Sequence, residues 1–450
     1  MKKIILLSFF ISFLFRFKAQ QAPTMETYTL KNGLKIYLMK YGKIEAMYLS
    51  IIINSGKKNE TPGQQGYNGI VANLVLQGNS KFDEEQQNDK AFAIGAELST
   101  SSNFDNTRIS SNFLSKDANT VFEMMSAAIQ QPLFKKEKVD QHISYLINYN
   151  NPTKMDIGGM AQIYSNLSLY GLESPLGRSI YKNQLKLITP EKLKEFHQFN
   201  YTPKNTKIVV CGNFDSNEIK KLVEIYFGNW QSTYGEVNGV ALEEPQIKNK
   251  EYYFVNRSGA TQSALEWNKP APSVKDKNAI GFYVANLLFN QALFKEIREI
   301  GGKTYAIGSS HQTSQFSNLM SIGCSVRNSE LYNTVVLFDK TLAKFNSEPI
   351  KQQDFENEIV RYKTHVLSLE FPDEIVEFYD PVKHDFSKQL NHVNELGKLK
   401  LEDVQKIIKK YFSPDAYKLV IAGDEVVVGP QLEKIKNLKK YSPADLEYKK

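Results

Sequence analysis

An arginine and a tyrosine stand seven residues apart, as Arg298 and Tyr305, in the segment LFKEIREIGGKTYAIGSS, residues 293–310. The helix predicted over residues 279–300 should end at Gly301-Gly302, because glycine adopts the left-handed conformation that ends helices. The chain should then return as a strand carrying Tyr305, so that both side chains flank one corner. There they could donate hydrogen bonds to a carbonyl oxygen that gains negative charge. Alternatively, Arg298 could face the helix C-terminus and Tyr305 could fill the core.

Histidines are the first candidates for a metal site, and the chain has six. No two of them form a His-x-x-x-His pair on one helical face. His197 falls in an amphipathic helix and is predicted to pack or to face solvent, whereas His384 and His392 flank a loop with Asp385. A metal site rebuilt from such histidines is the weakest alternative. A Gly-x-Ser-x-Gly elbow and a phosphate-binding glycine loop are also missing, so the first half alone indicates a scaffold.

The N-terminus predicts export. Residues 1–19 start with positive charge and continue with an apolar run, Ile4–Phe15, that is too short to span a bilayer, which is typical of a secretory signal peptide. We expect a periplasmic protein, free or attached to the cell envelope, with no transmembrane segment in the mature chain. The formal charge of +7 falls to +3 without the four cations of this peptide, and nothing favours nucleic acid. Cys211 and Cys324 lie in apolar runs, which favours buried free thiols over a disulfide.

The elements around these residues occur twice. The segment ITPEKLKEFHQFNYTPKNTKIVVCGN, residues 188–213, aligns without a gap on KLKLEDVQKIIKKYFSPDAYKLVIAGD, which ends at Asp424. Pro203 falls on Pro414 in this alignment. Each copy predicts an amphipathic helix, a proline turn and a buried strand. The chain is therefore interpreted as two fused copies of one domain.

Strand patterns precede helix patterns in each half, as in the hairpin expected around Asn32-Gly33 and the third helix expected around Met160–Tyr170. This order favours an α+β fold with two homologous domains, each an antiparallel-rich mixed sheet packed by helices. A polar, glycine- and proline-punctuated stretch separates the halves. The predicted divisions are a signal peptide over 1–19, an N-terminal domain over 20–228, a linker over 229–250 and a C-terminal domain over 251–450.

Five segments together resemble the pitrilysin/insulinase family of zinc metallopeptidases, in its two-domain bacterial and mitochondrial-processing-peptidase form. The resemblance covers almost all of the mature chain, and the order and spacing of the segments make it specific. The segments are LKNGLKIYLMK, GAELSTSSNFDNTRISSNF, SPLGRSIYKNQLKLITPEKLKEFHQFNYTPKNTKIVVCGNFD, GATQSALEW and LFKEIREIGGKTYAI.

The zinc motif of that family is degenerate in this chain. Family members carry His-x-x-Glu-His inside a helix, and the matching stretch GYNGIVANLVLQG, residues 66–78, places Gly69, Ala72 and Asn73 at the three positions. The family's further glutamate ligand is missing as well, since residues 138–172 contain no glutamate. A catalytic zinc needs three protein ligands and a base. The resemblance therefore implies that this chain binds no zinc itself.

The other half of the family's active site is retained. Family members hold the substrate and its tetrahedral intermediate with an arginine and a tyrosine that match Arg298 and Tyr305, and in two-chain members one subunit supplies this pair and the other the zinc. The resemblance implies a non-catalytic subunit, inert alone, that completes in trans the site of a homologous zinc-bearing subunit for peptide hydrolysis. The alternative is an inert peptide-binding or structural scaffold. It is favoured by Ser99-Thr100 where the family has Asn-Ala, and by the missing glycine-rich loop after Asn286.

Overall fold

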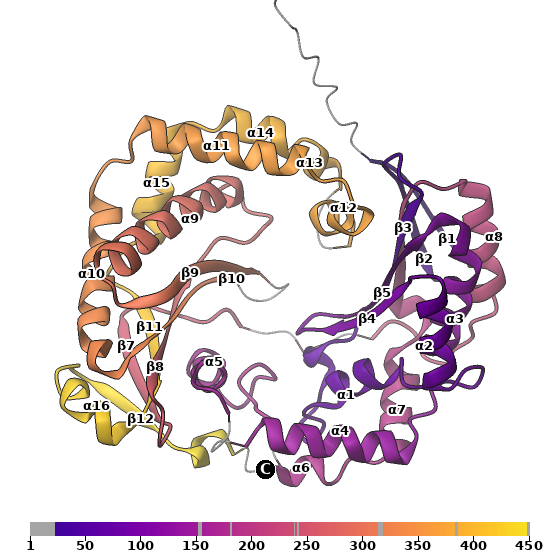
Figure 1. Cartoon of the computed structure of the whole chain (residues 1–450), viewed down its shortest axis with the longest axis horizontal. Coiled ribbons are helices and arrows are strands. Elements are labelled where there is room, and N and C mark those ends of the chain that lie inside the picture. The colour runs from indigo at the N-terminus through magenta and orange to yellow at the C-terminus, as the bar shows by residue number, and fades with distance from the viewer. Residues whose placement is uncertain are drawn as a thin grey trace, which may run out of the picture.

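The computed structural model describes residues 23–151, 155–180, 182–237, 239–240, 243–313, 318–382 and 386–447. These residues form two six-stranded sheets covered by helices, which lie on opposite sides of Figure 1. The predicted α+β fold with two mixed sheets is thus confirmed. The predicted signal peptide lies outside the described residues. Within them, no helix is both long and apolar enough to cross a membrane.

The first sheet has the strand order β1-β2-β6-β3-β5-β4. Its strands are β1 (Thr24–Thr29), β2 (Lys35–Lys40), β3 (Ala46–Ile53), β4 (Glu97–Ser102), β5 (Thr107–Leu114) and β6 (Thr206–Gly212). The helices of this half are α1 (Tyr67–Leu74), α2 (Glu84–Ala93), α3 (Ala118–Gln130), α4 (Lys136–Tyr149), α5 (Ile157–Tyr170), α6 (Lys182–Leu185), α7 (Pro190–Asn200) and α8 (Ser216–Phe227). The predicted hairpin is confirmed, because β1 pairs antiparallel with β2 and Gly33 has a φ of 91° in the loop between them.

The second sheet has the strand order β12-β7-β11-β8-β10-β9. Its strands are β7 (Lys250–Asn256), β8 (Gln262–Pro270), β9 (Thr304–Thr313), β10 (Asn318–Arg327), β11 (Tyr417–Gly423) and β12 (Leu438–Tyr441). The helices are α9 (Ala279–Leu293), the π-helix η4 (Phe294–Ile300), α10 (Leu331–Ser347), α11 (Gln352–Leu367), α12 (Pro372–Tyr379), α13 (Phe386–Leu390), α14 (His392–Lys398), α15 (Leu401–Tyr411) and α16 (Glu425–Leu432).

The sequence repeat corresponds to a structural repeat. The helix–strand pairs α7–β6 and α15–β11 occupy the same place in the two strand orders, and in each sheet the repeated strand pairs parallel to one neighbour and antiparallel to the other. The outer edges differ. Strand β1 precedes β2 and pairs antiparallel with it, whereas β12 comes from the C-terminal end of the chain and pairs parallel with β7.

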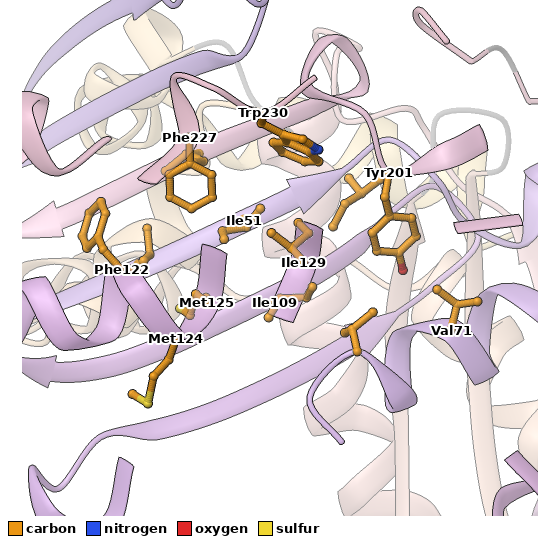
Figure 2. Packing of buried hydrophobic residues seen from close by; sticks show 14 of the residues in the cluster. Ile51, Val71, Ile109, Phe122, Met124, Met125, Ile129, Tyr201, Phe227 and Trp230 are labelled. Carbon is orange, nitrogen blue, oxygen red and sulfur yellow. The ribbon is translucent and has the colours of Figure 1, made fainter. Parts of the chain in front are cut away.

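One face of each sheet packs against helices of its own half. Figure 2 shows part of the first core, where side chains of α3 and α8 meet the strands, among them Ile51, Ile109, Phe122, Met125, Ile129 and Phe227. In the second core, the Trp267 ring stacks on Phe338 with the ring centroids 4.2 Å apart. Cys211 and Cys324 are buried free thiols, as the sequence predicted.

The other face of each sheet is covered in part by a helix from the opposite half. Helix α5 packs on β8 and β11 of the second sheet, and α12 packs on β3 and β6 of the first. Ile375 and Val376 of α12 are 1% exposed, and burying such side chains contributes about 1.5–3 kcal/mol each. The Arg108 guanidinium and the Asp380 carboxylate, 2.6 Å apart, join the halves beside α12. The helix expected around Met160–Tyr170 is confirmed as α5, but the repeat did not indicate that it packs on the other sheet.

Candidate active-site corner

The corner that carries Arg298 begins in a π-helix. The predicted continuous helix over residues 279–300 is wrong in this respect, because α9 ends at Leu293 and η4 continues with wider turns. The Gly301 amide donates to the Glu296 carbonyl oxygen at 3.0 Å, five residues earlier. Short π-helical segments often occur at functional sites, since the wider turn offsets the side chains that follow.

The two glycines of the corner are needed for different reasons. Gly302 has a φ of 58°, the left-handed conformation that the sequence predicted for the helix end. Gly301 is right-handed with a φ of −74°, but a Cβ atom there would lie 2.8 Å from both the Glu296 carbonyl oxygen and Leu337 Cδ2. Close packing therefore excludes a side chain at Gly301, and backbone conformation disfavours one at Gly302.

A β-bulge then turns Tyr305 outward. Two residues of β9, Tyr305 and Ala306, lie opposite the single residue Ser325 of β10, where the register between these strands shifts by one. Both bulge residues are exposed, whereas regular alternation would bury one of them. The Tyr305 side chain is 86% exposed. The alternative in which Tyr305 fills the core is therefore wrong.

Arg298 lies against the exposed tyrosine. Its Cζ atom is 5.1 Å from the centroid of the Tyr305 ring and 4.6 Å from that of Phe294. A guanidinium over an aromatic face at an exposed site gains about 0.5–1 kcal/mol. Stacking leaves the N–H edge of the guanidinium and the phenolic hydroxyl available to a ligand. The structure thus brings together the two predicted site residues.

Asparagines of α9 hold the strand beyond the corner. The Asn290 amide accepts from the Ser309 N–H at 2.6 Å and donates to the Ser309 carbonyl oxygen at 3.0 Å, while the Asn286 oxygen accepts from the Ser309 hydroxyl. Because β9 is an edge strand, these bonds satisfy backbone groups that would otherwise pair with another strand. As expected from the sequence, the helix runs from Asn286 to the corner without a glycine-rich loop.

The degenerate zinc positions all lie on α1. Ala72 is buried, Asn73 is exposed, and the Asn73 amide donates to the Gly69 carbonyl oxygen at 2.8 Å. A Cβ atom added at Gly69 would meet no heavy atom within 4 Å. Over the described residues, no three His, Cys, Asp or Glu side chains lie close enough to hold a metal ion. These residues therefore do not fit the zinc ion that members of the resembled family bind at these positions.

A buried carboxylate fixes the start of α1, which the sequence analysis missed. Glu60 accepts hydrogen bonds from the N–H groups of Gly66 and Asn68 at 3.1 and 2.9 Å. Burial raises the pKa of Glu60 to about 7, and the nearby Lys57 and Arg178 oppose that rise. An acidic residue shortly before a glycine-rich helix start was the available signal. Helix α1 is thus held firmly although it carries no metal ligands.

Two of the described histidines make hydrogen bonds within the fold. His197 is buried, and its Nε2 lies 2.8 Å from the Ile129 carbonyl oxygen, so of the two predicted positions, packed or facing solvent, it takes the packed one. Burial lowers the pKa of His197 to about 4. The His392 Nε2 shares a hydrogen bond of 2.8 Å with the Tyr362 hydroxyl. His384 and Asp385 lie outside the described residues.

The first half also presents an edge strand. Ser99 and Thr100 lie on β4, the last strand of the first sheet, which faces the centre of Figure 1 together with β5. The hydroxyl groups of Ser99 and Ser110 are hydrogen-bonded at 2.9 Å across these strands. The Ser99 hydroxyl is thus already engaged within the sheet, although the residue is exposed.

Two family profiles match the chain. Residues 38–155 match Insulinase (Peptidase family M16), and residues 187–360 match the Peptidase M16 inactive domain. The chain belongs to the insulinase family of peptidases. The second profile includes Arg298 and Tyr305, and the first includes the helix with Gly69, Ala72 and Asn73.

Relatives of this insulinase-family chain include zinc proteases and a processing-peptidase subunit. The uncharacterized zinc protease YmxG of Bacillus subtilis is 22% identical over 87% of this chain and 96% of its own length. The mitochondrial-processing peptidase subunit beta of Neurospora crassa is 20% identical over 46% of this chain and 45% of its own length. The family thus includes proteins that work as subunits.

Solved structures confirm the fold. The peptidase M16 inactive domain from Pseudomonas fluorescens has a TM-score of 0.80 at 16% identity and covers 89% of this chain and 98% of its own. The periplasmic protease PqqL from Escherichia coli has a TM-score of 0.68 at 15% identity, covering 94% of this chain and 49% of its own. The two-sheet arrangement is therefore a shared architecture of the family.

Proposed function

We propose that this chain is the non-catalytic subunit of a heterodimeric zinc peptidase of the insulinase family. Arg298 and Tyr305 would extend from the corner into the site of a homologous, zinc-bearing partner. There they would donate hydrogen bonds to the peptide carbonyl oxygen that becomes negatively charged during hydrolysis. The observation that carries this proposal is the Arg298 guanidinium packed against a tyrosine that is 86% exposed.

The exposure of Tyr305 is what favours a role in trans. The ring stands on a bulged edge strand beside the Arg298 guanidinium, so that both polar groups can reach the site of another chain. The zinc would belong to the partner, since Gly69, Ala72 and Asn73 offer no ligand set. Alone, the chain is therefore expected to be inert. We place the complex in the periplasm because residues 1–19 are typical of a signal peptide.

A catalytically inert peptide-binding or structural scaffold is the second candidate. It is favoured by the asparagine side chains that occupy the Ser309 backbone groups on β9. It is also favoured by the engaged Ser99 hydroxyl on β4. A scaffold of this kind would keep its partner bound whatever residue stood at Arg298.

Isolation of the tagged mature chain from its own cell envelope tests the proposal. We expect an equimolar homologue with a His-x-x-Glu-His motif in the eluate, together with peptide cleavage that a chelator stops. The purified single chain should cleave nothing. Chelator-sensitive cleavage by the single chain would refute the subunit role, and a complex without a zinc-motif homologue would favour the scaffold.

A further inference from the structure

A pocket of about 390 Å³ adjoins the exposed tyrosine on the second sheet. It lies where the bulged start of β9 meets the end of β10 and the start of β8. Its polar lining comes from Gln262, Lys303, Thr304, Tyr305, Ser325 and Arg327.

The pocket carries an excess of positive charge. The Lys303 ammonium forms an ion pair of 2.6 Å with the Glu330 carboxylate, which lies next to the pocket. The hydrogen bond from Lys303 lowers the pKa of Glu330, and the charge of Arg327 adds to that shift. Two positive charges, on Lys303 and Arg327, thus share the single negative charge of Glu330. Because none of the lining residues is acidic, about one positive charge is left for a ligand.

Strand register places donors beside the arginine. Arg327 of β10 lies directly opposite Gln262 of β8 in the antiparallel ladder, so both side chains leave the same face of the sheet. The guanidinium fork and the amide N–H groups can therefore approach one acceptor together. The Thr304 hydroxyl is bonded to the Ser325 carbonyl oxygen at 2.7 Å, which holds the opposite wall.

We propose that this pocket binds a peptide carboxylate, with Arg327 as its principal donor. A planar carboxylate with two acceptor oxygens matches a guanidinium fork, and a single excess charge matches a monoanion. The inference rests on the proposed function in taking a peptide as the ligand, because Tyr305 belongs to both sites. The carboxylate comes from the peptide's C-terminus or from an aspartate or glutamate side chain.

Binding of labelled peptides to the purified mature chain, without any partner, tests this proposal. Three N-terminally labelled peptides are compared: the first has a free C-terminus and no acidic side chain, the second is the same sequence with a C-terminal amide, and the third is that amide with one internal residue replaced by glutamate. Fluorescence anisotropy should show about tenfold tighter binding for a peptide that carries the recognised carboxylate. Preference for the first peptide identifies the C-terminus as the source, and preference for the third identifies the side chain.

Variants decide whether Arg327 is responsible. Arg327→Gln should bring all three peptides to the affinity of the plain amide, and Arg327→Lys should restore part of the preference because it keeps the charge. Arg361→Gln is the matched control: Arg361 is an exposed arginine on α11 that pairs with Glu358, glutamine can still donate to that carboxylate, and the affinities of the three peptides should not change. Thermal unfolding of each variant reports whether it folds. Equal binding of all peptides by the native chain, or a preference that survives Arg327→Gln, would overturn the proposal.

Failure of this inference and failure of the proposed function give different results. The peptide assay uses the chain alone, so it can succeed when no zinc-bearing partner exists. Conversely, a complex whose turnover depends on Arg298 supports the subunit role even if the three peptides bind equally. Loss of both signals would leave the scaffold.

Discussion

Helix α1 in the first half and the η4–β9 corner in the second are both held by specific contacts, yet they present different chemistry. Glu60 fixes the start of α1, but its outward residues Gly69 and Asn73 offer no ligand. At the corner, a π-helix and a bulge turn Arg298 and Tyr305 toward solvent. The two regions are thus held by comparably specific contacts, but only the corner presents a positive charge beside a phenolic hydroxyl.

The largest effect is expected on the activity of the complex when the corner of the second half is altered. Arg298→Ala in the isolated complex should lower kcat by about 10²–10³, because a donor to the developing oxyanion is lost. Steady-state kinetics with a quenched peptide would measure this. Arg361→Gln, at an exposed arginine of the second half that pairs with Glu358, should leave kcat unchanged. Unaltered turnover for Arg298→Ala in an intact complex would remove the proposed distinction between corner and scaffold.

Glu266 and His197 should contribute pH dependences of stability of opposite sign. Burial raises the pKa of Glu266 on β8 from its ordinary value of 4.5 to about 7, so its contribution to stability should be lost as the pH rises from about 4.5 to 7, as should that of Glu60. Burial lowers the pKa of His197 on α7 from 6.5 to about 4, so stability should fall as the pH drops from about 6.5 to 4. Each contribution is about 3 kcal/mol at most.

Urea unfolding at a series of pH values checks both signs. Glu266→Gln should reduce the loss of stability as the pH rises from about 4.5 to 7, where Glu60 accounts for a further part, and His197→Gln should reduce the loss as the pH drops from about 6.5 to 4. Each variant serves as the control for the other, because His197 lies on α7 in the first half and Glu266 lies on β8 in the second sheet. A Glu266→Gln variant with the native pH profile would show that this carboxyl group titrates normally.

Replacing glycine by alanine should have opposite effects on the free energy of unfolding at the corner and on α1. Gly301→Ala should lower the free energy of unfolding by about 1–3 kcal/mol, because its Cβ atom meets Glu296 and Leu337 atoms at 2.8 Å. It should also displace Arg298 and reduce turnover of the complex. Denaturant unfolding and kinetics on one preparation measure both. Native stability for this variant would contradict the close packing at the corner.

The smallest effect is expected on α1. Gly69→Ala should raise the free energy of unfolding by about 1 kcal/mol, since alanine favours a helix interior and nothing lies within 4 Å of the new methyl group. Turnover of the complex should not change. A destabilised Gly69→Ala variant would indicate that this face of α1 is covered in the free chain.

Much of the fold could be predicted from local patterns. The aligned proline turns and apolar runs predicted the α7–β6 and α15–β11 units, and Gly301-Gly302 predicted the corner. The packing of α5 and α12 on the sheet of the opposite half could not be predicted. An amphipathic pattern shows that a helix is buried on one side, but not which sheet covers it. In both halves, therefore, the pattern of the helix leaves the covering sheet undetermined.

The site was predicted only in part, for a similar reason. Arg298 and Tyr305 are close in sequence, so a short turn decides their proximity. Gln262 and Arg327 meet only through the pairing of β8 with β10, and the bulge at Tyr305 arises from a register shift that no local pattern contains. The π-helix likewise depends on contacts with the elements around it.

The packing of α12 on the first sheet has a consequence for biosynthesis. One face of β3 and β6, with apolar residues such as Ile52 and Val209, stays uncovered until α12 has been made. At usual rates of synthesis this delay is on the order of ten seconds. The first half therefore leaves the ribosome as a binding site for chaperones, and truncation before Pro372 should yield a chain that aggregates rather than a stable N-terminal domain.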